Sequence, residues 1–347
     1  MRKLAIALAF LFALTDAQAA RTYLFVSHMN DKKISVIDTA TNGLIRDIKL
    51  DCLARDMELS PDGEYLYFAG FDTNSVGRIR LKTLAPDSET VSVGLAPVAL
   101  AVSRDGSTVY AANSKSKNIS IIDTAAYDVR GEPLQLPGTP KAVALSTDGA
   151  RLYAALAGQG GIAVMDTKTG EISGVIQTGA DPYAMCVSDN RLFVTNEGMA
   201  SISVIDTRKN RLVNEIVSTD SPRGIDYIGG MLYVAVMNGV DMFETGKYEK
   251  PASSGFDYPV YGVAAGKSPS GPRAYVAGFN KGEKTGKIAV IDASENEVIE
   301  EFDLAGSPMY LEIKKDRPTT APTKAATAMP TDTPVPAATA TPEPTAT

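Results

Sequence analysis

NISIIDTAAYD, residues 118–128, is one of five closely similar stretches in this chain of 347 residues. The others are KISVIDTATNG from Lys33, GIAVMDTKTG from Gly161, SISVIDTRKN from Ser201 and KIAVIDASENE from Lys287. Each alternates apolar residues with small or polar ones and then reaches Asp, which is typical of a half-buried β-strand that ends at a turn. Recurrence about every forty residues predicts a repeat architecture.

A second motif, an apolar residue followed by an aromatic and small residues, occurs seven times. Its aromatic residues are 40 to 43 positions apart: Phe25, Tyr67, Tyr110, Tyr153, Phe193, Tyr233 and Tyr275. Asp-Gly pairs at 62–63, 105–106 and 148–149 precede it and mark tight hairpins, because Gly adopts the left-handed backbone state without steric cost. The chain leaves each repeat for the next near a recurring proline: Pro97, Pro140, Pro182, Pro222, Pro259 and Pro308.

Four short strands in each repeat of about 42 residues, repeated seven times, predict an all-β fold. We expect a seven-bladed β-propeller with four antiparallel strands per blade. The first copy begins at its second strand, near Tyr23, and the missing first strand is predicted at 308–316. Pairing of this C-terminal strand with the N-terminal blade would close the ring and remove an exposed sheet edge.

The recurring LYVA, ISVIDT and proline-linked AVS-x-DG motifs resemble those of the YVTN-repeat β-propellers of bacterial and archaeal surface-layer and periplasmic proteins. The resemblance covers residues 21–316. Arg80 and Glu244 replace the motif Asp in the second and sixth copies, and KSPSGPR replaces the Asp-Gly turn in the seventh. These departures weaken the identity of the repeats but not the fold prediction.

Both ends of the chain differ from the repeats. Residues 1–19 combine Arg2, Lys3, an apolar run and Ala-Gln-Ala, which is the pattern of a secretory signal peptide. In 318–347, Thr, Pro and Ala make up 25 of 30 residues, which predicts a disordered tail or stalk. The predicted organisation is a signal peptide (1–19), a propeller (20–316) and a tail (317–347). We expect an exported protein, at the cell surface or in the periplasm, with no transmembrane segment in the mature chain.

Composition disfavours several functions. The formal net charge is −7 and no basic run exceeds three residues, so no nucleic-acid partner is expected. His28 is the only histidine, which argues against His-rich metal sites and catalysis by paired imidazoles. Cys52 and Cys186 lack CxxC or haem-attachment spacing, and either two thiols or one disulfide is compatible with the sequence. No cofactor and no metal are expected.

The motif aspartates have a structural interpretation. Each ends a predicted third strand, where its side chain can accept hydrogen bonds from the following backbone amides and the next Thr can support the same turn. These structural turn residues are Asp38, Asp123, Asp166, Asp206 and Asp292. Because one lies in each of five blades around a wide ring, they cannot converge on one metal ion.

The predicted binding face is formed by the connections between blades and the loops joining second to third strands. Residues that follow the repeat proline surround the mouth of the central channel there: Arg55, Val98, Lys141, Tyr183, Arg223, Val260 or Tyr261, and Met309 or Tyr310. Basic and tyrosine side chains at one opening would attract anions and suit sugars. The alternative is a rim of cations that only keeps the face soluble. His28 is expected on the same face, as an exposed side chain.

Three function classes follow. The first is a non-catalytic platform that binds a protein or a cell-envelope glycan at the loop face. The second is a lactonase-like hydrolase of sugar-acid lactones, which would need a convergent acid–base set in the channel. Predicted channel strands such as VALAVS, KAVALS and YAMCVS are instead apolar and small. The third is an accessory subunit of a periplasmic redox enzyme, although the chain has no haem motif.

Overall fold

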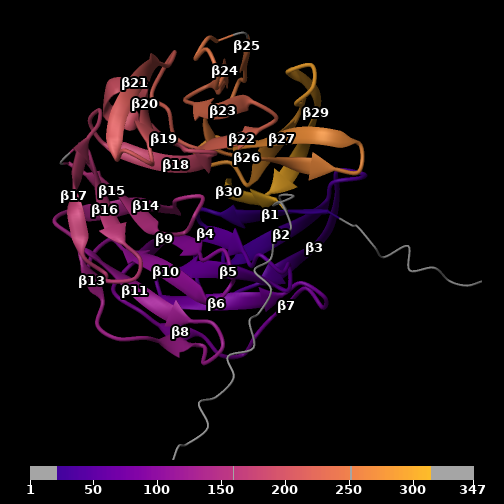
Figure 1. The fold of residues 1–347 in the computed structure, drawn as a ribbon. Coiled ribbons are helices and arrows are strands. Elements are labelled where there is room, and N and C mark those ends of the chain that lie inside the picture. Colours follow the sequence, from indigo (N-terminus) through magenta and orange to yellow (C-terminus); the bar gives the residue numbers. More distant parts are fainter. Residues whose placement is uncertain (1–21, 159, 251, 314–347) are drawn as a thin grey trace, which may run out of the picture. The chain divides into compact units, whose positions relative to one another are not determined.

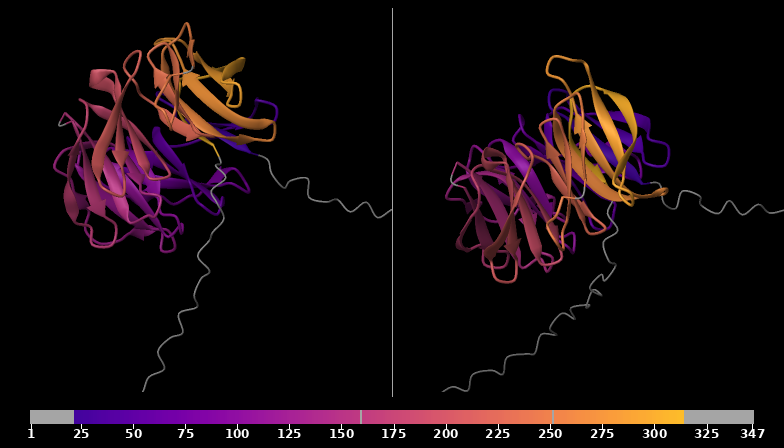
Figure 2. Two further views of the ribbon diagram at one scale, coloured as in Figure 1. Left: turned by 45° about the horizontal axis from the view of Figure 1, so that its top comes forward. Right: turned by 90° about the horizontal axis from the view of Figure 1, so that it is seen from above.

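The computed structural model describes residues 22–158, 160–250 and 252–313. These residues form seven antiparallel sheets arranged as the blades of a β-propeller (Figures 1 and 2). The predicted fold class is therefore confirmed. The predicted signal peptide and tail lie outside the described residues, so the domain boundaries stay predictions. No helix in the described ranges is long and apolar enough to cross a membrane.

The strands follow the repeat order of the sequence. Blade 1 contains β30 (Pro308–Ile313), β1 (Tyr23–His28), β2 (Lys33–Asp38) and β3 (Gly43–Lys49). Blade 2 contains β4 (Ala54–Leu59), β5 (Tyr65–Gly70), β6 (Ser75–Arg80), β7 (Ala85–Pro86) and β8 (Val91–Ser92). Blade 3 contains β9 (Pro97–Val102), β10 (Thr108–Asn113), β11 (Asn118–Asp123), β12 (Asp128–Val129) and β13 (Leu134–Gln135). Blade 4 contains β14 (Thr139–Leu145), β15 (Arg151–Ala157), β16 (Gly161–Asp166) and β17 (Ile172–Gln177).

The remaining blades have the same order. Blade 5 contains β18 (Pro182–Ser188), β19 (Arg191–Asn196), the 3₁₀ helix η1 (Glu197–Met199), β20 (Ser201–Asp206) and β21 (Arg211–Val217). Blade 6 contains β22 (Ile225–Ile228), β23 (Met231–Val236), β24 (Gly239–Glu244) and β25 (Ala252–Gly255). Blade 7 contains β26 (Val260–Ser268), β27 (Gly271–Gly278), β28 (Thr285–Asp292) and β29 (Glu297–Ala305).

Ring closure occurs as predicted from the displaced first strand. β30 pairs antiparallel with β1, with Leu24 opposite Ile313 and Val26 opposite Leu311. The side chain of Ile313 is fully buried. One sheet thus contains strands from both ends of the described chain.

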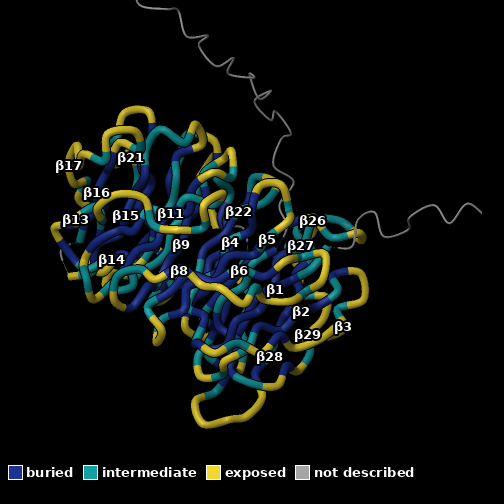
Figure 3. Tube along the Cα trace, turned by 90° about the horizontal axis from the view of Figure 1, so that it is seen from below, coloured by how far each residue is buried: buried dark blue, intermediate teal, exposed yellow. Residues whose placement is uncertain are grey.

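The core lies between neighbouring blades and is dominated by the second and third strands (Figure 3). The aromatic residues of the repeat are buried, and several reach the next blade. The Tyr233 hydroxyl donates to Asn296 Oδ1 at 2.7 Å, and the Tyr153 hydroxyl lies 2.9 Å from the Asn210 amide. A buried Tyr hydroxyl needs such a partner, which explains why an aromatic residue with a polar tip suits this position.

The motif Asp forms the turn after the third strand in five of the seven blades. Asp123 Oδ1 accepts hydrogen bonds from the amides of Ala125 and Ala126 at 2.9 and 3.0 Å. The Thr124 hydroxyl donates to the Gly106 carbonyl at 2.7 Å and so ties this turn to the preceding Asp-Gly hairpin. The other motif aspartates also accept from amides two residues later: Asp38, Asp166, Asp206 and Asp292.

Candidate binding site at the channel mouth

One face of the propeller gathers the connections between blades and the loops that join second to third strands. The two kinds of segment bond to each other directly. The amides of Phe71, Glu197 and Phe279 donate to the carbonyls of Leu53, Asp181 and Pro259, at 3.0 to 3.1 Å. These bonds fix the loops beside the inner strands. The innermost strands of the blades, β30, β4, β9, β14, β18, β22 and β26, surround the centre of the ring (Figure 1).

The predicted cations of this face each lie over an aromatic ring. Arg55 is 4.8 Å from the ring centroid of Phe71, Lys141 is 6.0 Å from that of Tyr183, and Arg223 is 5.1 Å from that of Tyr261. The ring of Tyr261 also stacks on Phe279, with centroids 4.7 Å apart. Arg223 is further held by Glu197 at 3.0 Å. Pairing with rings orients these cations before any ligand arrives.

Two of the predicted tyrosines meet across the channel. Tyr183 lies on β18 in blade 5 and Tyr310 on β30 in blade 1, and each side chain is close enough to the other to shift its pKa. Burial raises the pKa of Tyr310 well above its ordinary value, and the nearby Arg55 guanidinium acts in the opposite direction. Because blades 1 and 5 are not neighbours in the ring, these two side chains approach each other across the opening.

The structure also resolves the alternatives at two positions. Val260 is fully buried and Met309 nearly so, whereas Tyr261 and Tyr310 are half-buried. Tyr261 and Tyr310 are therefore the more exposed member of each pair. Val98 is half-buried at the corresponding point of β9.

The sequence interpretation missed the carboxylates of β4. The apolar expectation fits β9 and β14, but β4 reads ARDMEL and brings Asp56 and Glu58 to the channel. Asp56 Oδ2 accepts the Leu100 amide of the next blade at 2.7 Å. Burial, with a smaller contribution from Glu58, raises the pKa of Asp56 to about 7, and Asp56 lies near enough to Tyr310 to raise its pKa too. The signal was available, because Asp56 stands where other repeats carry Ala99, Ala142 and Ala184, and the position of Glu58 is acidic again at Asp226 and Glu312.

The raised pKa of Asp56 predicts a pH-dependent stability. The folded protein retains this proton up to about pH 7, whereas the unfolded chain releases it near pH 4. The Asp56 contribution to the free energy of unfolding therefore falls as pH rises from about 4 to about 7. Asp56→Asn should raise Tm by about 2–4 °C at pH 8 and leave it unchanged at pH 4.

Thermal unfolding of wild type and Asp56→Asn at the two pH values measures this effect. Asp123→Asn is the matched control, since backbone amides lower the pKa of that exposed carboxyl, and it should give no gain at pH 8. An Asp56→Asn gain of equal size at both pH values would contradict the titration argument.

Phe71 and Phe279 were also missed. Each follows Ala-Gly directly after a second strand, in AGF at 69–71 and 277–279. This shared motif, present in blades 2 and 7, could have indicated a common position. In the structure both rings pack on a predicted mouth residue, Arg55 and Tyr261 respectively.

The expectation that His28 is exposed is wrong. Its side chain is fully buried because it occupies the repeat position of Asn113 and Asn196, which close the loop to the third strand. Asn196 Nδ2 donates to Ser201 and Ser203 at 3.0 and 2.9 Å. His28 Nε2 likewise lies 2.9 Å from Ser35 Oγ.

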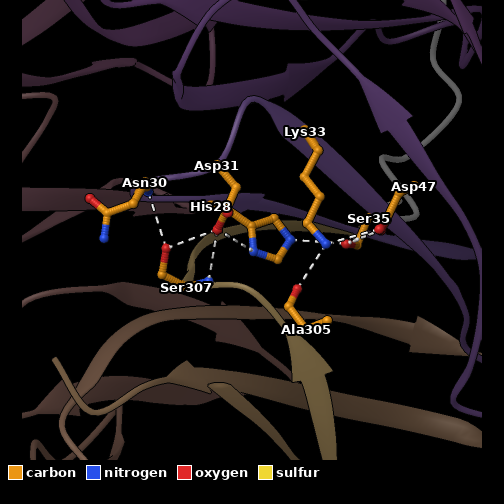
Figure 4. A network of polar contacts seen from close by, with 8 residues as sticks. All are labelled: His28, Asn30, Asp31, Lys33, Ser35, Asp47, Ala305 and Ser307. Atoms are coloured by element: carbon orange, nitrogen blue, oxygen red, sulfur yellow. Dashed lines mark hydrogen bonds and ion pairs between the residues drawn. The ribbon is translucent and has the colours of Figure 1, made fainter. Parts of the chain in front are cut away.

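The protonation of His28 follows from its partners (Figure 4). The Ser35 hydroxyl donates its hydrogen to Asp47 at 2.6 Å, so His28 Nε2 must carry the proton that it gives to Ser35. Burial and, to a smaller extent, the Lys33 charge lower the pKa of His28 to about 4. The imidazole is therefore neutral and structural, and it is not part of the mouth surface.

A polar network joins this histidine to the point of ring closure (Figure 4). Asp31 Oδ2 accepts the Ser307 amide and hydroxyl, both at 3.2 Å, and Lys33 donates to Asp47 and to the Ala305 carbonyl. Beside it is a hollow of about 480 Å³ lined by Asn30, Asp31, Lys33, Glu283, Lys284, Ala305, Gly306 and Ser307. These contacts hold the connection from blade 7 to blade 1.

The two cysteines are not joined by a disulfide. Both are buried, and burial raises the pKa of the Cys52 thiol to about 11. Across the described ranges, no group of three or more His, Cys, Asp or Glu side chains is arranged to hold a metal ion.

Comparison with known proteins supports the fold. No protein-family model matches the chain, and no curated protein sequence matches it. A chain of Kuenenia stuttgartiensis hydrazine synthase is similar in structure, with TM-score 0.64, 19% identity, and coverage of 74% of this chain and 88% of that one.

Two further structures are similar. Dihydro-heme d1 dehydrogenase NirN in complex with DHE has TM-score 0.64 and 16% identity, and covers 84% of this chain and 74% of its own. A functionally unknown protein from Desulfotomaculum acetoxidans has TM-score 0.73 and 14% identity, and covers 84% and 99%. At these identities the likeness shows a shared propeller fold alone.

Proposed function

We propose that this protein is an exported, non-catalytic β-propeller that binds a partner on the loop face around the channel mouth. Its repeat motifs support membership of the YVTN-repeat family, and its N-terminal segment supports export to the cell surface or periplasm. The observation that carries the proposal is the set of three cation–ring pairs at Arg55, Lys141 and Arg223. Oriented cations on a protein of net charge −7 favour an anionic partner at this face.

The geometry favours binding over channel chemistry. A lactonase would admit its substrate to an acid–base set in the channel. Here Tyr183 and Tyr310 approach each other across the mouth. The inner-strand carboxylates Asp56 and Asp226 each accept an amide of the next blade, from Leu100 and Ala265. A partner that rests on the rim needs no opening of this pair.

Retention on the organism's own cell-envelope fraction tests the proposal. The mature chain is compared with Arg55→Gln/Lys141→Gln/Arg223→Gln at low and high salt. We expect salt-sensitive retention of wild type and at least about tenfold weaker retention of the variant, because rim charges govern attraction to an oppositely charged surface. The control Lys82→Gln/Lys168→Gln/Arg208→Gln removes three exposed charges from turns at the opposite end of the strands and should be retained like wild type.

Two results would reject the proposal. One is the absence of wild-type retention, and the other is equal retention of the rim variant. The redox alternative is suggested by the names of two structural neighbours, hydrazine synthase and NirN. It predicts a different experimental result. A redox subunit would co-purify with a redox partner or change the absorption spectrum of added haem, whereas the binding platform would do neither.

A further inference from the structure

Charge is distributed unevenly around the loop face. In blades 3 and 4 the described segments on this face are 93–97, 113–118, 136–141, 157–158 and 160–161. They contain Lys115, Lys117 and Lys141 but no Asp or Glu. All three lysines are exposed. Arg55 extends this group from the connection that enters blade 2. We call Arg55, Lys115, Lys117 and Lys141, with Leu95 among them, the basic sector.

Other cations of this face lie beside acidic residues, either in sequence or in space. Lys281 and Lys284 flank Glu283 in the loop after β27, and three further cations form ion pairs. Arg223 pairs with Glu197 at 3.0 Å, Lys32 with Asp72 at 2.8 Å, and Lys287 with Asp303 at 3.3 Å. Within the described residues, none of the four sector cations forms an ion pair with a carboxylate. Asp181, at the next connection along the ring, is engaged by the Gly158 amide at 3.0 Å. In the described residues, blades 3 and 4 therefore combine lysines that form no ion pair with face segments that contain no Asp or Glu, and Arg55 extends this group.

Leu95 is an apolar side chain fixed inside this basic sector. Its side chain is 53% exposed, although its backbone is held on both sides. The Leu95 amide donates to Ser116 Oγ at 2.7 Å, and its carbonyl accepts the Lys115 amide at 3.1 Å. A large exposed apolar residue held rigidly beside two lysines suits a partner that offers both a carboxylate and an apolar side chain.

The aromatic rings of the mouth argue against a sugar as the main contact. Sugar recognition uses an open aromatic face, but the rings here already have partners. Lys141 lies over Tyr183 and Arg55 over Phe71. Tyr261 lies between Arg223 and Phe279. The groups of the basic sector that remain available to a ligand are its cationic side chains and Leu95.

We propose that the partner is a protein, and that it docks an acidic segment carrying a large apolar side chain on the basic sector. Carboxylates would pair with Lys115, Lys117, Lys141 and Arg55, while the apolar side chain would cover Leu95. Arg223, already neutralised by Glu197, takes no direct part. This inference rests on the proposed function and names the class of partner and the half of the mouth that binds it.

Selection from a displayed library of random twelve-residue peptides tests the docking chemistry. The immobilised full mature chain is the target, and peptides that also bind Lys115→Gln/Lys117→Gln are removed. We expect enriched peptides to combine several Asp or Glu residues with at least one large apolar residue. No enrichment, or enrichment of sequences without acidic residues, would overturn the proposal.

Fluorescence anisotropy with the enriched peptides then locates the site. Affinity should fall at least about tenfold for Lys115→Gln/Lys117→Gln and about threefold or more for Leu95→Ser, since a close charge pair and a central apolar contact are each worth 1 kcal/mol or more. Arg223→Gln should stay within about twofold of wild type. A loss for Arg223→Gln equal to that of the double lysine variant would overturn the assignment to the basic sector. Displacement by polygalacturonate but not by excess of an unlabelled acidic peptide would identify a glycan site instead.

The envelope-retention experiment separates the basic-sector proposal from the proposed function. If the envelope fraction retains Lys115→Gln/Lys117→Gln fully but releases Arg223→Gln, the platform function stands and the basic-sector proposal falls. If it retains neither wild type nor any variant, both fall. Because Lys115 and Lys117 are exposed, the double variant should fold like wild type, and circular dichroism measures whether it does.

Discussion

Removal of residues 308–347 is expected to abolish cooperative folding, whereas removal of 317–347 should leave the propeller intact. The longer deletion removes β30, the innermost strand of blade 1 and the partner of β1. It takes away the fully buried Ile313 and the nearly buried Met309 and exposes the edge of β1. Loss of one such side chain costs about 2–5 kcal/mol, and the whole strand therefore approaches the entire stability of about 5–15 kcal/mol of an ordinary domain.

Circular dichroism melting of the two truncated chains measures the effect of β30. The chain that ends at residue 316 serves as the control for loss of the C-terminal segment. We expect a cooperative transition for the control and none for the chain that ends at residue 307. A shared transition within about 5 °C, a difference of roughly 2 kcal/mol at this size, would contradict a closing role for β30.

The repeat spacing predicted the fold and the closure because both follow from strand order alone. Seven aromatic strands imply seven blades, and a first copy that begins at Tyr23 must find its missing strand elsewhere. Register then follows from alternation, since a shift by one residue would turn every buried side chain of a strand outward.

The arrangement of the mouth was less accessible to sequence reasoning. Its cations and tyrosines were found from their distance to the repeat proline, but several of their partners come from other blades. Glu197 pairs with Arg223 over 26 positions, and Tyr183 reaches Tyr310 across the ring. Such contacts depend on the width of the channel and on side-chain direction, which no local pattern contains.

His28 and Asp56 show two different sources of error. His28 was assigned by its nearness to a loop, whereas alignment of LFVSH with VYAAN and LFVTN would have placed it with buried Asn113 and Asn196. Asp56 was not predicted because the prediction rested on residues shared by the repeats, and Asp56 occurs in one repeat only. In a repeat protein the departures carry the individual chemistry, since the shared residues are needed by every blade.

Gly262→Ala is expected to destabilise the propeller by about 3 kcal/mol, because it would force apart the inner strands of blades 7 and 1. A Cβ atom at Gly262 on β26 would overlap the backbone carbonyl oxygen of Met309 on β30, and a backbone group in a paired strand cannot rotate away as a side chain can. Blades 3, 4 and 5 carry Ala at this point, at positions 99, 142 and 184, whereas blade 6 carries Gly224, whose Cβ would meet the backbone of Gly262 and Val263. The restriction therefore applies to the inner strands of blades 6, 7 and 1 and not to the whole repeat.

Gly246→Ala is the matched control for the same chemical change. A Cβ atom there would meet no heavy atom within 4 Å, so its Tm should equal that of wild type or rise slightly through the stiffer unfolded chain. Gly262→Ala should lower Tm by about 5–10 °C in the same melting experiment. Equal Tm values for Gly262→Ala and wild type would mean that β26 and β30 can move apart without loss of stability. Closure of the propeller would then depend only on the pairing of β30 with β1.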